Sequence, residues 1–215
     1  MTKVFFSVGI TLDGFLAPEG MDLAHADDPT YKDWLGQWMA LQSWISQQEF
    51  FRKNLKLGEG GEKGEDNRIL EDTFNRTGVS IMGKRMFEGG ERFWPEEAPF
   101  HTPVFVLTKQ VRSPWKRPGG TTFYFVNDGI ESALRQAREV SGGRDIRIAG
   151  GANAILQYLN AGLVDEFDLA LAPVVFGSGV RLFEGIDRRK VALDIVEAPP
   201  SPLVTHLRYA VRKPA

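Results

Sequence analysis

The sequence has no cysteine among its 215 residues. A disulfide framework, a thiolate metal site and a cysteine nucleophile are therefore excluded. No apolar run approaches the length of about 18 residues that spans a bilayer, so we expect no transmembrane helix. The N-terminal segment reaches Asp13 after a short apolar run, which argues against a signal peptide and favours a cytoplasmic protein.

The chain also lacks the common signatures of nucleotide, metal and hydrolase sites. Neither the dinucleotide pattern GxGxxG nor the P-loop GxxxxGK[ST] occurs. The three histidines, His25, His101 and His206, are isolated and have no ligand spacing, so we expect no metal. GSG at 177–179 is not a GxSxG nucleophile elbow, because only one residue separates its glycines.

Charge of one sign is not in excess. The 26 basic and 28 acidic residues give a formal net charge of −2, and the basic residues are scattered. Nucleic-acid-binding proteins usually carry a basic patch. We therefore expect a small-molecule substrate as the partner, and neither nucleic acid nor a membrane.

Strand and helix patterns alternate regularly along the sequence. Runs of β-branched and aromatic residues predict strands, and apolar residues at helical spacing predict helices. The predicted strands are 3–10, 78–82, 103–108, 121–126, 145–149, 164–176, 191–198 and 203–211. The predicted helices are Tyr31 to about Leu55, 68–76, one that begins after Gly83, 129–141, and one that begins at Ala152 and ends at Gly162. Residues 18–30 and 58–66 are predicted loops.

This order of elements predicts an α/β fold with a three-layer, mostly parallel sheet. Prolines separate the last two strands, so we expect these strands to form an antiparallel pair at the C-terminal edge. Ligands of such sheets bind at the carboxyl ends of the strands, where helices begin. The chemistry is expected at that edge.

The predicted helix from Tyr31 carries three of the five tryptophans. Trp34, Trp38, Leu41 and Ile45 recur on one helix face. This stripe is either a packing surface, in the core or at a dimer interface, or an aromatic wall for a planar substrate.

Two junctions between a strand and a helix are marked by glycine. The first reads Gly83, Lys84, Arg85 and Met86, and the second reads Gly150, Gly151, Ala152 and Asn153. The first amides of a helix have no partner within the helix and attract phosphate, and glycine lets a ligand approach the backbone. The alternatives are a tight turn at the first junction and close packing of helix against sheet at the second. Together, the two junctions favour a dinucleotide, which has two ends to hold.

A third candidate site lies at the end of strand 103–108. Thr108 and Lys109, together with Arg85 and Arg112, are suited to hold a 2′-phosphate and so to select NADP over NAD. The alternative is an ordinary polar strand end.

The motifs in order resemble a known family. TLDGFLA (11–17), IMGKRMFE (81–88), PVFVLT (103–108), IAGGANAILQYL (148–159) and the run from Gly162 to Phe183 are similar to the reductase domain of bacterial riboflavin bifunctional deaminase-reductases, and more distantly to dihydrofolate reductase. The resemblance implies a single dihydrofolate-reductase-like domain over 1–215, with a flexible loop near 57–68. It also implies NADPH as cofactor and a homodimer.

The resemblance also assigns roles to residues. Gly83, Lys84, Arg85 and Met86 would hold phosphates on the adenosine side, Leu107, Thr108 and Lys109 would flank the adenine ribose, and Gly150, Gly151, Ala152 and Asn153 would hold the pyrophosphate, with the Gly-Gly bond often cis. Gly9, Leu16 and Ala17 would line the nicotinamide through their backbone. Ser7, Asp13 and Gly14 would lie on the substrate side.

The sequence departs from the family on that substrate side. Ser7 stands where riboflavin reductases commonly have a lysine, and Ala149 stands where they usually have a glutamate before the Gly-Gly pair. GGERFW replaces an acidic Asp-Asp-Pro after the first phosphate helix. The acid that dihydrofolate reductases use in the pocket has no secure counterpart, and Asp33 is a candidate.

The first hypothesis for function is an NADPH-dependent oxidoreductase. It would pass hydride to a C=N or C=O carbon of a small heterocyclic substrate, by default one like 5-amino-6-(5-phosphoribosylamino)uracil or dihydrofolate. The proton would come from water or from Asp13, whose alternative role is to cap its own turn. The second hypothesis is a non-catalytic nucleotide-binding module, and the third is a structural or interaction protein.

Overall fold

The central feature of the fold is a sheet whose strands run mostly parallel. The computed structural model describes residues 2–20 and 29–212, and within these ranges nine strands form one sheet in the order β10-β11-β8-β1-β7-β3-β4-β6-β5. The six inner strands are parallel: β1 (Val4–Thr11), β3 (Thr77–Gly83), β4 (Pro103–Leu107), β6 (Thr122–Val126), β7 (Asp145–Gly150) and β8 (Glu166–Ala172).

The C-terminal edge is antiparallel, as predicted. β11 (Thr205–Arg212) pairs antiparallel with β8, and β10 (Ala192–Glu197) pairs antiparallel with β11. At the opposite edge, β5 (Trp115–Lys116) pairs antiparallel with β6, a strand that the sequence patterns did not predict. The predicted fold class, an α/β sheet of the dihydrofolate-reductase type, is therefore confirmed.

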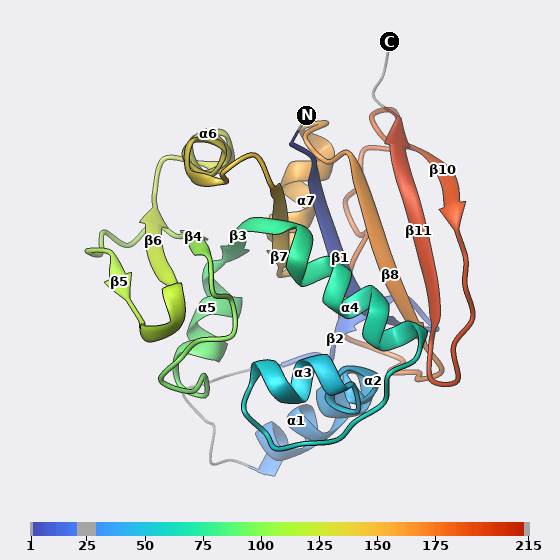
Figure 1. Cartoon of the computed structure of the whole chain (residues 1–215). Coiled ribbons are helices and arrows are strands. Elements are labelled where there is room, and N and C mark those ends of the chain that lie inside the picture. The colour runs from blue at the N-terminus through green and yellow to red at the C-terminus, as the bar shows by residue number, and fades with distance from the viewer. Residues whose placement is uncertain (1, 21–28, 213–215) are drawn as a thin grey trace.

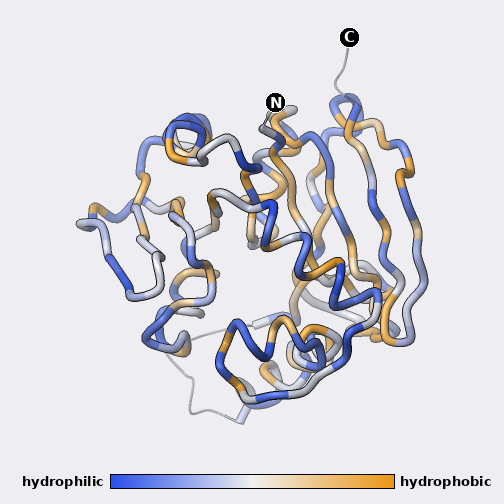
Figure 2. Tube along the Cα trace, in the orientation of Figure 1, coloured by the Kyte–Doolittle hydropathy of each residue, from blue (hydrophilic) through white to orange (hydrophobic). Residues whose placement is uncertain are grey.

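The central strands are buried because helices cover both faces of the sheet. On β1, Phe6 and Ile10 join the cluster that packs against α6 (Ile130–Val140) and α7 (Ala152–Asn160). Phe5 points to the opposite face, where α4 (Glu65–Arg76) lies and the guanidinium of Arg76 is 3.9 Å from the Phe5 ring centre. Figure 1 shows α4 in front of the sheet and α7 behind it. Strands buried on both faces are nearly continuously apolar, and Figure 2 shows hydrophobic residues along the inner strands.

The predicted helix from Tyr31 to Leu55 is wrong as one element, since three shorter helices take its place. They are α1 (Pro29–Leu41), α2 (Ser43–Ser46) and α3 (Glu49–Asn54). Gln48 has extended backbone between α2 and α3, and its side-chain amide donates to the Trp44 carbonyl at 2.6 Å. A straight helix of this length would extend about 37 Å. The breaks let Leu41 and Trp44 pack instead against Leu70 of α4.

The structure favours the packing interpretation for part of the tryptophan stripe, since Trp34 and Leu41 are buried. Tyr31, Trp34 and Trp44 are buried, and the Trp34 indole donates to the Pro18 carbonyl at 3.1 Å. Trp38 is partly exposed and stacks on Trp34 with ring centres 6.2 Å apart. The aromatic residues therefore attach α1 to the chain that follows β2 (Phe15–Ala17).

Several predicted boundaries move for local reasons. β8 ends at Ala172, not at residue 176, because Pro173 has no N–H for the ladder and the chain turns there, with the Val174 amide bonded to the Ala172 carbonyl. β9 (Val180–Arg181) follows that turn and pairs with β2 in a second small sheet. α4 begins at Glu65, three residues before the predicted start, so the glycine-rich loop is shorter than predicted.

The glycine-rich loop is tied to α3. Backbone hydrogen bonds join the Glu62 amide to the Gln47 carbonyl at 2.8 Å and the Glu49 amide to the Glu62 carbonyl at 3.0 Å. Downstream, α5 (Lys84–Glu91) follows β3 on the same face of the sheet as α4, and the one-turn helix η2 (Pro118–Gly120) lies between β5 and β6. None of the helices in the described ranges has both the length and the hydrophobicity needed to cross a bilayer.

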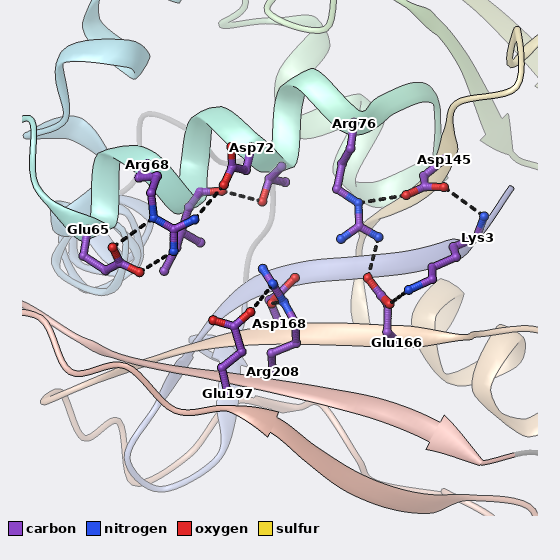
Figure 3. Close-up of polar contacts among 12 residues, drawn as sticks. Lys3, Glu65, Arg68, Asp72, Arg76, Asp145, Glu166, Asp168, Glu197 and Arg208 are labelled. Carbon is purple, nitrogen blue, oxygen red and sulfur yellow. Dashed lines mark hydrogen bonds and ion pairs between the residues drawn. The ribbon is translucent and has the colours of Figure 1, made fainter. Parts of the chain in front are cut away.

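An ion-pair network fastens α4 to the sheet (Figure 3). Arg76 contacts Asp145 at 2.9 Å and Glu166 at 2.5 Å, and Lys3 also pairs with Glu166. Burial acts to raise the pKa of Glu166, but its bonds to Lys3 and Arg76 outweigh this effect and leave the pKa below its usual value. In the same view, Arg208 bridges Asp168 and Glu197.

Candidate cofactor and substrate site

The two glycine-marked helix starts lie side by side at the carboxyl edge of the sheet. Met82 is in register with Gly150, so β3 and β7 end together. A methyl group placed on Gly83 would lie 3.7 Å from the Gly151 amide nitrogen. Gly83 and Gly151 are the N-caps of α5 and α7. Because glycine has no side chain, these residues do not cap the first amides of their helices. The N-terminal amides of α5 and α7 therefore lie close together at the carboxyl ends of β3 and β7. Such an arrangement suits an extended anionic ligand.

The second junction is shaped by close backbone packing. The Gly150–Gly151 peptide is cis, as the family resemblance implies. Gly150 has φ +138°, and a methyl group on it would lie 3.0 Å from the sulfur of Met86. A methyl group on Gly151 would meet nothing within 4 Å. The positive φ of Gly150 thus favours glycine there, whereas the space beside Gly151 is open to a ligand.

The polar side chains at this cradle are available for a ligand. Lys84 forms only a 3.4 Å pair with Glu88 on its own helix, a partly exposed contact of little energy. Arg85 is exposed, and the structure shows no ion pair to it from residues 2–20 or 29–212. Ala152 is partly exposed, and the side-chain Oδ1 of Asn153 accepts from the Gln157 side-chain amide at 2.6 Å.

The end of β4 lies beside the first junction. Leu107 is in register with Gly83, and the Thr108 hydroxyl accepts from the Gln110 amide at 3.1 Å. Lys109 is exposed. Arg112 pairs with Glu91 at 2.8 Å and lies over the Phe125 ring, so the protein itself already holds this guanidinium. Arg85 and Lys109 are the better candidates for a 2′-phosphate.

Gly9 marks the side expected to face the nicotinamide. A methyl group on Gly9 would lie 3.3 Å from the side-chain nitrogen of Gln42, so the Gln42 carboxamide covers the β1 backbone there. Leu16 and Ala17 stand nearby in β2 and are partly exposed. Gln42 was not predicted, because it lies in the link between α1 and α2 and no local pattern marks it.

Asp13 anchors a loop. Its carboxylate accepts from the Thr11 hydroxyl at 2.5 Å, the Gly177 amide at 2.7 Å and the Phe176 amide at 3.1 Å. Burial acts to raise the pKa of Asp13, but these hydrogen bonds outweigh it and hold the pKa below its usual value. Gly14 has φ +89° and donates to the Thr11 carbonyl at 3.0 Å. The geometry favours the turn-capping alternative, and proton donation by Asp13 stays a prediction.

The substrate side contains a basic residue that the sequence analysis did not single out. Ser7 is partly exposed, and its carbonyl accepts from the guanidinium of Arg147 at 3.3 Å. Ala149 is buried with Met82 in the cluster beside α5. Asp33, the candidate pocket acid, is exposed and bonded to Gln37 at 2.8 Å. A cation thus lies next to Ser7, but it comes from β7.

Two surface cavities lie away from this edge. One, of about 440 Å³, is lined by residues of α6 and by Leu163, and the other, of about 330 Å³, lies between the end of α3 and residues 95–97. Neither includes a predicted site residue. Within the described ranges, no group of three or more histidine or acidic side chains is arranged to hold a metal ion.

The sequence of this chain is similar to a known family and to two bacterial proteins. Residues 2–202 match the family described as RibD C-terminal domain. The chain is 42% identical over 124 residues to the uncharacterized protein YyaP of Bacillus subtilis (strain 168), a match that covers 55% of this chain and 65% of YyaP. YwjB of the same organism, also uncharacterized, is 27% identical over 127 residues, covering 56% of this chain and 67% of YwjB. The matched segment thus spans about two thirds of these relatives.

Solved structures with little sequence identity share the architecture. A putative riboflavin biosynthesis protein from Shewanella sp. PV-4 superposes with TM-score 0.66 at 16% identity, over 99% of this chain and 100% of that one. A deaminase/5-amino-6-(5-phosphoribosylamino)uracil reductase from Thermotoga maritima gives 0.58 at 13%, over 98% and 57%. Dihydrofolate reductase from Enterococcus faecalis, complexed with NADP(H), gives 0.50 at 14%, over 98% and 97%.

Proposed function

The chain belongs to the RibD C-terminal domain family, and from this premise we propose that it is an NADPH-dependent reductase of a small heterocyclic substrate. When bound, the cofactor supplies a hydride to a C=N or C=O carbon. The chain's own residues bind that cofactor, orient it and place the substrate.

The observation that carries the proposal is the adjacency of the Gly83 and Gly151 helix starts. Their free amides suit the phosphates of a dinucleotide, and the space beside Gly151 leaves room for them. Lys84 and Arg85 add positive charge at the same edge. The residues present therefore fit the cofactor that the family resemblance implies.

The selection of NADPH over NADH rests on side chains around the end of β4. Arg85, Thr108 and Lys109 can bind a 2′-phosphate by charge-assisted hydrogen bonds, which are stronger than neutral ones. NADH lacks that phosphate. We therefore expect weaker binding of NADH.

Gly9, Leu16 and Ala17 would orient the nicotinamide through their backbone. Asp13 holds the loop after β8 in place beside them. Because a carboxylate with a lowered pKa is ionised near neutral pH, water is the better proton source.

The default substrate class is a pyrimidine of the kind named for the Thermotoga maritima neighbour, 5-amino-6-(5-phosphoribosylamino)uracil. The alternative function is a nucleotide-binding module without catalysis. Ser7 and Ala149, which replace the lysine and glutamate of the family, favour that alternative. Hydride transfer to a test substrate separates the two.

A titration of tryptophan fluorescence with NADPH and with NADH tests the cofactor assignment. We expect micromolar binding of NADPH and at least about tenfold weaker binding of NADH, a difference of about 1.4 kcal/mol. Lys84→Ala and Arg85→Ala should each weaken NADPH binding, whereas Arg144→Ala, on an exposed loop at the opposite end of β7, should not. Failure of both nucleotides to bind would overturn the assignment.

A further inference from the structure

Arg147 lies in the middle of the sheet, on the face covered by α4. β7, which carries it, is flanked by β1 and β3. The guanidinium lies 5.2 Å from the ring centre of Phe74 on α4. Ser7, whose carbonyl accepts from Arg147, faces the same layer, since its neighbour Phe6 packs on the opposite side with the α7 cluster.

Two side chains at this point of the sheet keep some contact with solvent. Ser7 and Arg147 are both partly exposed, although they belong to inner strands with helices on both faces. Phe5, two residues before Ser7 on the same strand face, is fully buried beneath Arg76. Phe5 is therefore covered completely, whereas the side chains of Ser7 and Arg147 are not.

Arg147 has no acidic partner in the described part of the chain. Its Nε atom is inaccessible to solvent and has no hydrogen-bond partner there. Asp168, the acid whose charge acts on it, is bonded to Arg208 at 2.6 Å (Figure 3). Burial lowers the pKa of Arg147 to about 10, and the attraction of Asp168 only partly opposes this shift.

An unpaired guanidinium in such a place is costly. A charge that is largely shielded from water and has no ionic partner destabilises a fold, and the hydrogen bond to the Ser7 carbonyl offsets only part of this cost. The other basic groups on this face are paired: Arg76 binds Asp145 and Glu166, and Arg208 binds Asp168 and Glu197. Arg147 is thus the group whose charge a bound anion would offset.

Ser7 and Arg147 are next to the place where hydride transfer is proposed. Ser7 and Gly9 are two residues apart on one strand face, about 7 Å. Arg147 precedes the Gly150–Gly151 junction by three residues on the adjacent strand. The Gln42 carboxamide lies over Gly9. A small ring that reaches the nicotinamide at Gly9 would place a substituent at Arg147.

We propose that Arg147 binds an anionic oxygen group of the substrate, a phosphate or a carboxylate, through its guanidinium. Arginine forms forked hydrogen bonds to both groups. This inference rests on the proposed reductase function, because it places the substrate relative to Gly9. Both default substrates carry such a group, and the proposal assigns its binding to Arg147.

The experiment uses the full chain labelled with ¹⁵N-arginine and saturated with NADP⁺. Inorganic phosphate and benzoate are titrated separately, and the Nε–H signals of the arginines are followed by NMR. The Arg147 signal is the one that is missing from Arg147→Met. We expect this signal to shift saturably with one of the two probes, and the probe that acts tells a phosphate site from a carboxylate site.

Thermal unfolding with and without the same probe supplies the second readout. The probe should raise the midpoint of the wild type and of the control Arg144→Met, because a ligand stabilises the state that binds it. Arg147→Met should lose this rise, and Arg147→Lys should keep a smaller one, since lysine retains the charge without the fork. The affinity for NADPH should change less than about twofold in Arg147→Met, well below the tenfold that 1.4 kcal/mol represents.

Two results would overturn the proposal. One is an Arg147 signal that neither probe moves. The other is an Arg147→Met variant that responds to the probe as the wild type does. A wild type that binds no NADPH would instead contradict the reductase function, and the anion response can then be measured without NADP⁺.

Discussion

At the scale of single residues, the adjacent glycines Gly150 and Gly151 have different structural roles. Gly150 combines φ +138° with a methyl-to-sulfur distance of 3.0 Å to Met86, so both its conformation and its surroundings exclude a side chain. Gly151 has φ −79° and open space around it. Backbone conformation favours glycine at the first position, and only a ligand would favour it at the second.

This difference predicts opposite behaviour for two alanine substitutions. Gly150→Ala should lower the free energy of unfolding by about 1–3 kcal/mol, the usual cost of a side chain held at positive φ. Gly151→Ala should change it by less than about 0.5 kcal/mol but should weaken NADPH binding, because its methyl group enters the phosphate cradle. Urea unfolding and the fluorescence titration measure the two effects. Unchanged NADPH affinity in Gly151→Ala would argue against a cradle at this junction.

At the scale of elements, the α1–α3 segment is fastened by a buried polar pair. The His206 ring on β11 lies 2.6 Å from the Asp66 carboxylate on α4, and both side chains are about 5% exposed. The Trp44 ring of α2 meets His206 edge-on at 5.3 Å. These two contacts of His206 therefore join β11, α4 and α2. Because α2 is held in this way, Gln42, which lies between α1 and α2, stays in place over Gly9 of β1.

Removing His206 should loosen this whole assembly. His206→Leu leaves the Asp66 carboxyl buried without its partner, so we expect a loss of about 2–4 kcal/mol in the free energy of unfolding. His101→Gln, at an exposed histidine, is the control and should cost less than about 1 kcal/mol. Chemical denaturation measures both. Equal stability of the two variants would show that the Asp66 pair is not what holds the segment.

At the scale of the whole molecule, ion pairs join the amino ends of strands that are far apart in sequence. Arg76 links the end of α4 to Asp145 on β7 and Glu166 on β8, and Lys3 precedes β1. The carboxyl edge, in contrast, carries the basic residues Lys84, Arg85 and Lys109. The ion pairs of this network and the proposed cofactor site thus lie at opposite ends of the sheet. The homodimer and the cytoplasmic location stay predictions.

Breaking the network should destabilise the fold in a way that depends on pH. Arg76→Met should cost about 2–4 kcal/mol at neutral pH, because Asp145 loses its ion-pair partner and Glu166 keeps only Lys3. Arg135→Met removes an exposed pair with Glu139 and should cost less than about 1 kcal/mol. Denaturation at several pH values compares the two variants.

The pH dependence follows from the lowered pKa of Glu166. Its contribution to stability is present above its unfolded value of 4.5 and is lost as pH falls through its lower folded value. The difference between Arg76→Met and the wild type should therefore shrink as pH falls below about 4. A difference that stays constant down to acidic pH would contradict the assigned role of Glu166.

The sequence by itself determined the chain order of the six parallel strands, the antiparallel C-terminal edge and the two junctions at Gly83 and Gly150, but not the short strands β2, β5 and β9. These features depend on local periodicity and on the backbone freedom of glycine and proline, which a single stretch of chain reveals. Only the tertiary structure decided that Gln42 covers Gly9, that Arg147 reaches Ser7 without an acidic partner in the described chain, and that the helix from Tyr31 breaks twice. Each of these depends on which distant residues meet across the sheet, and no local pattern contains that information.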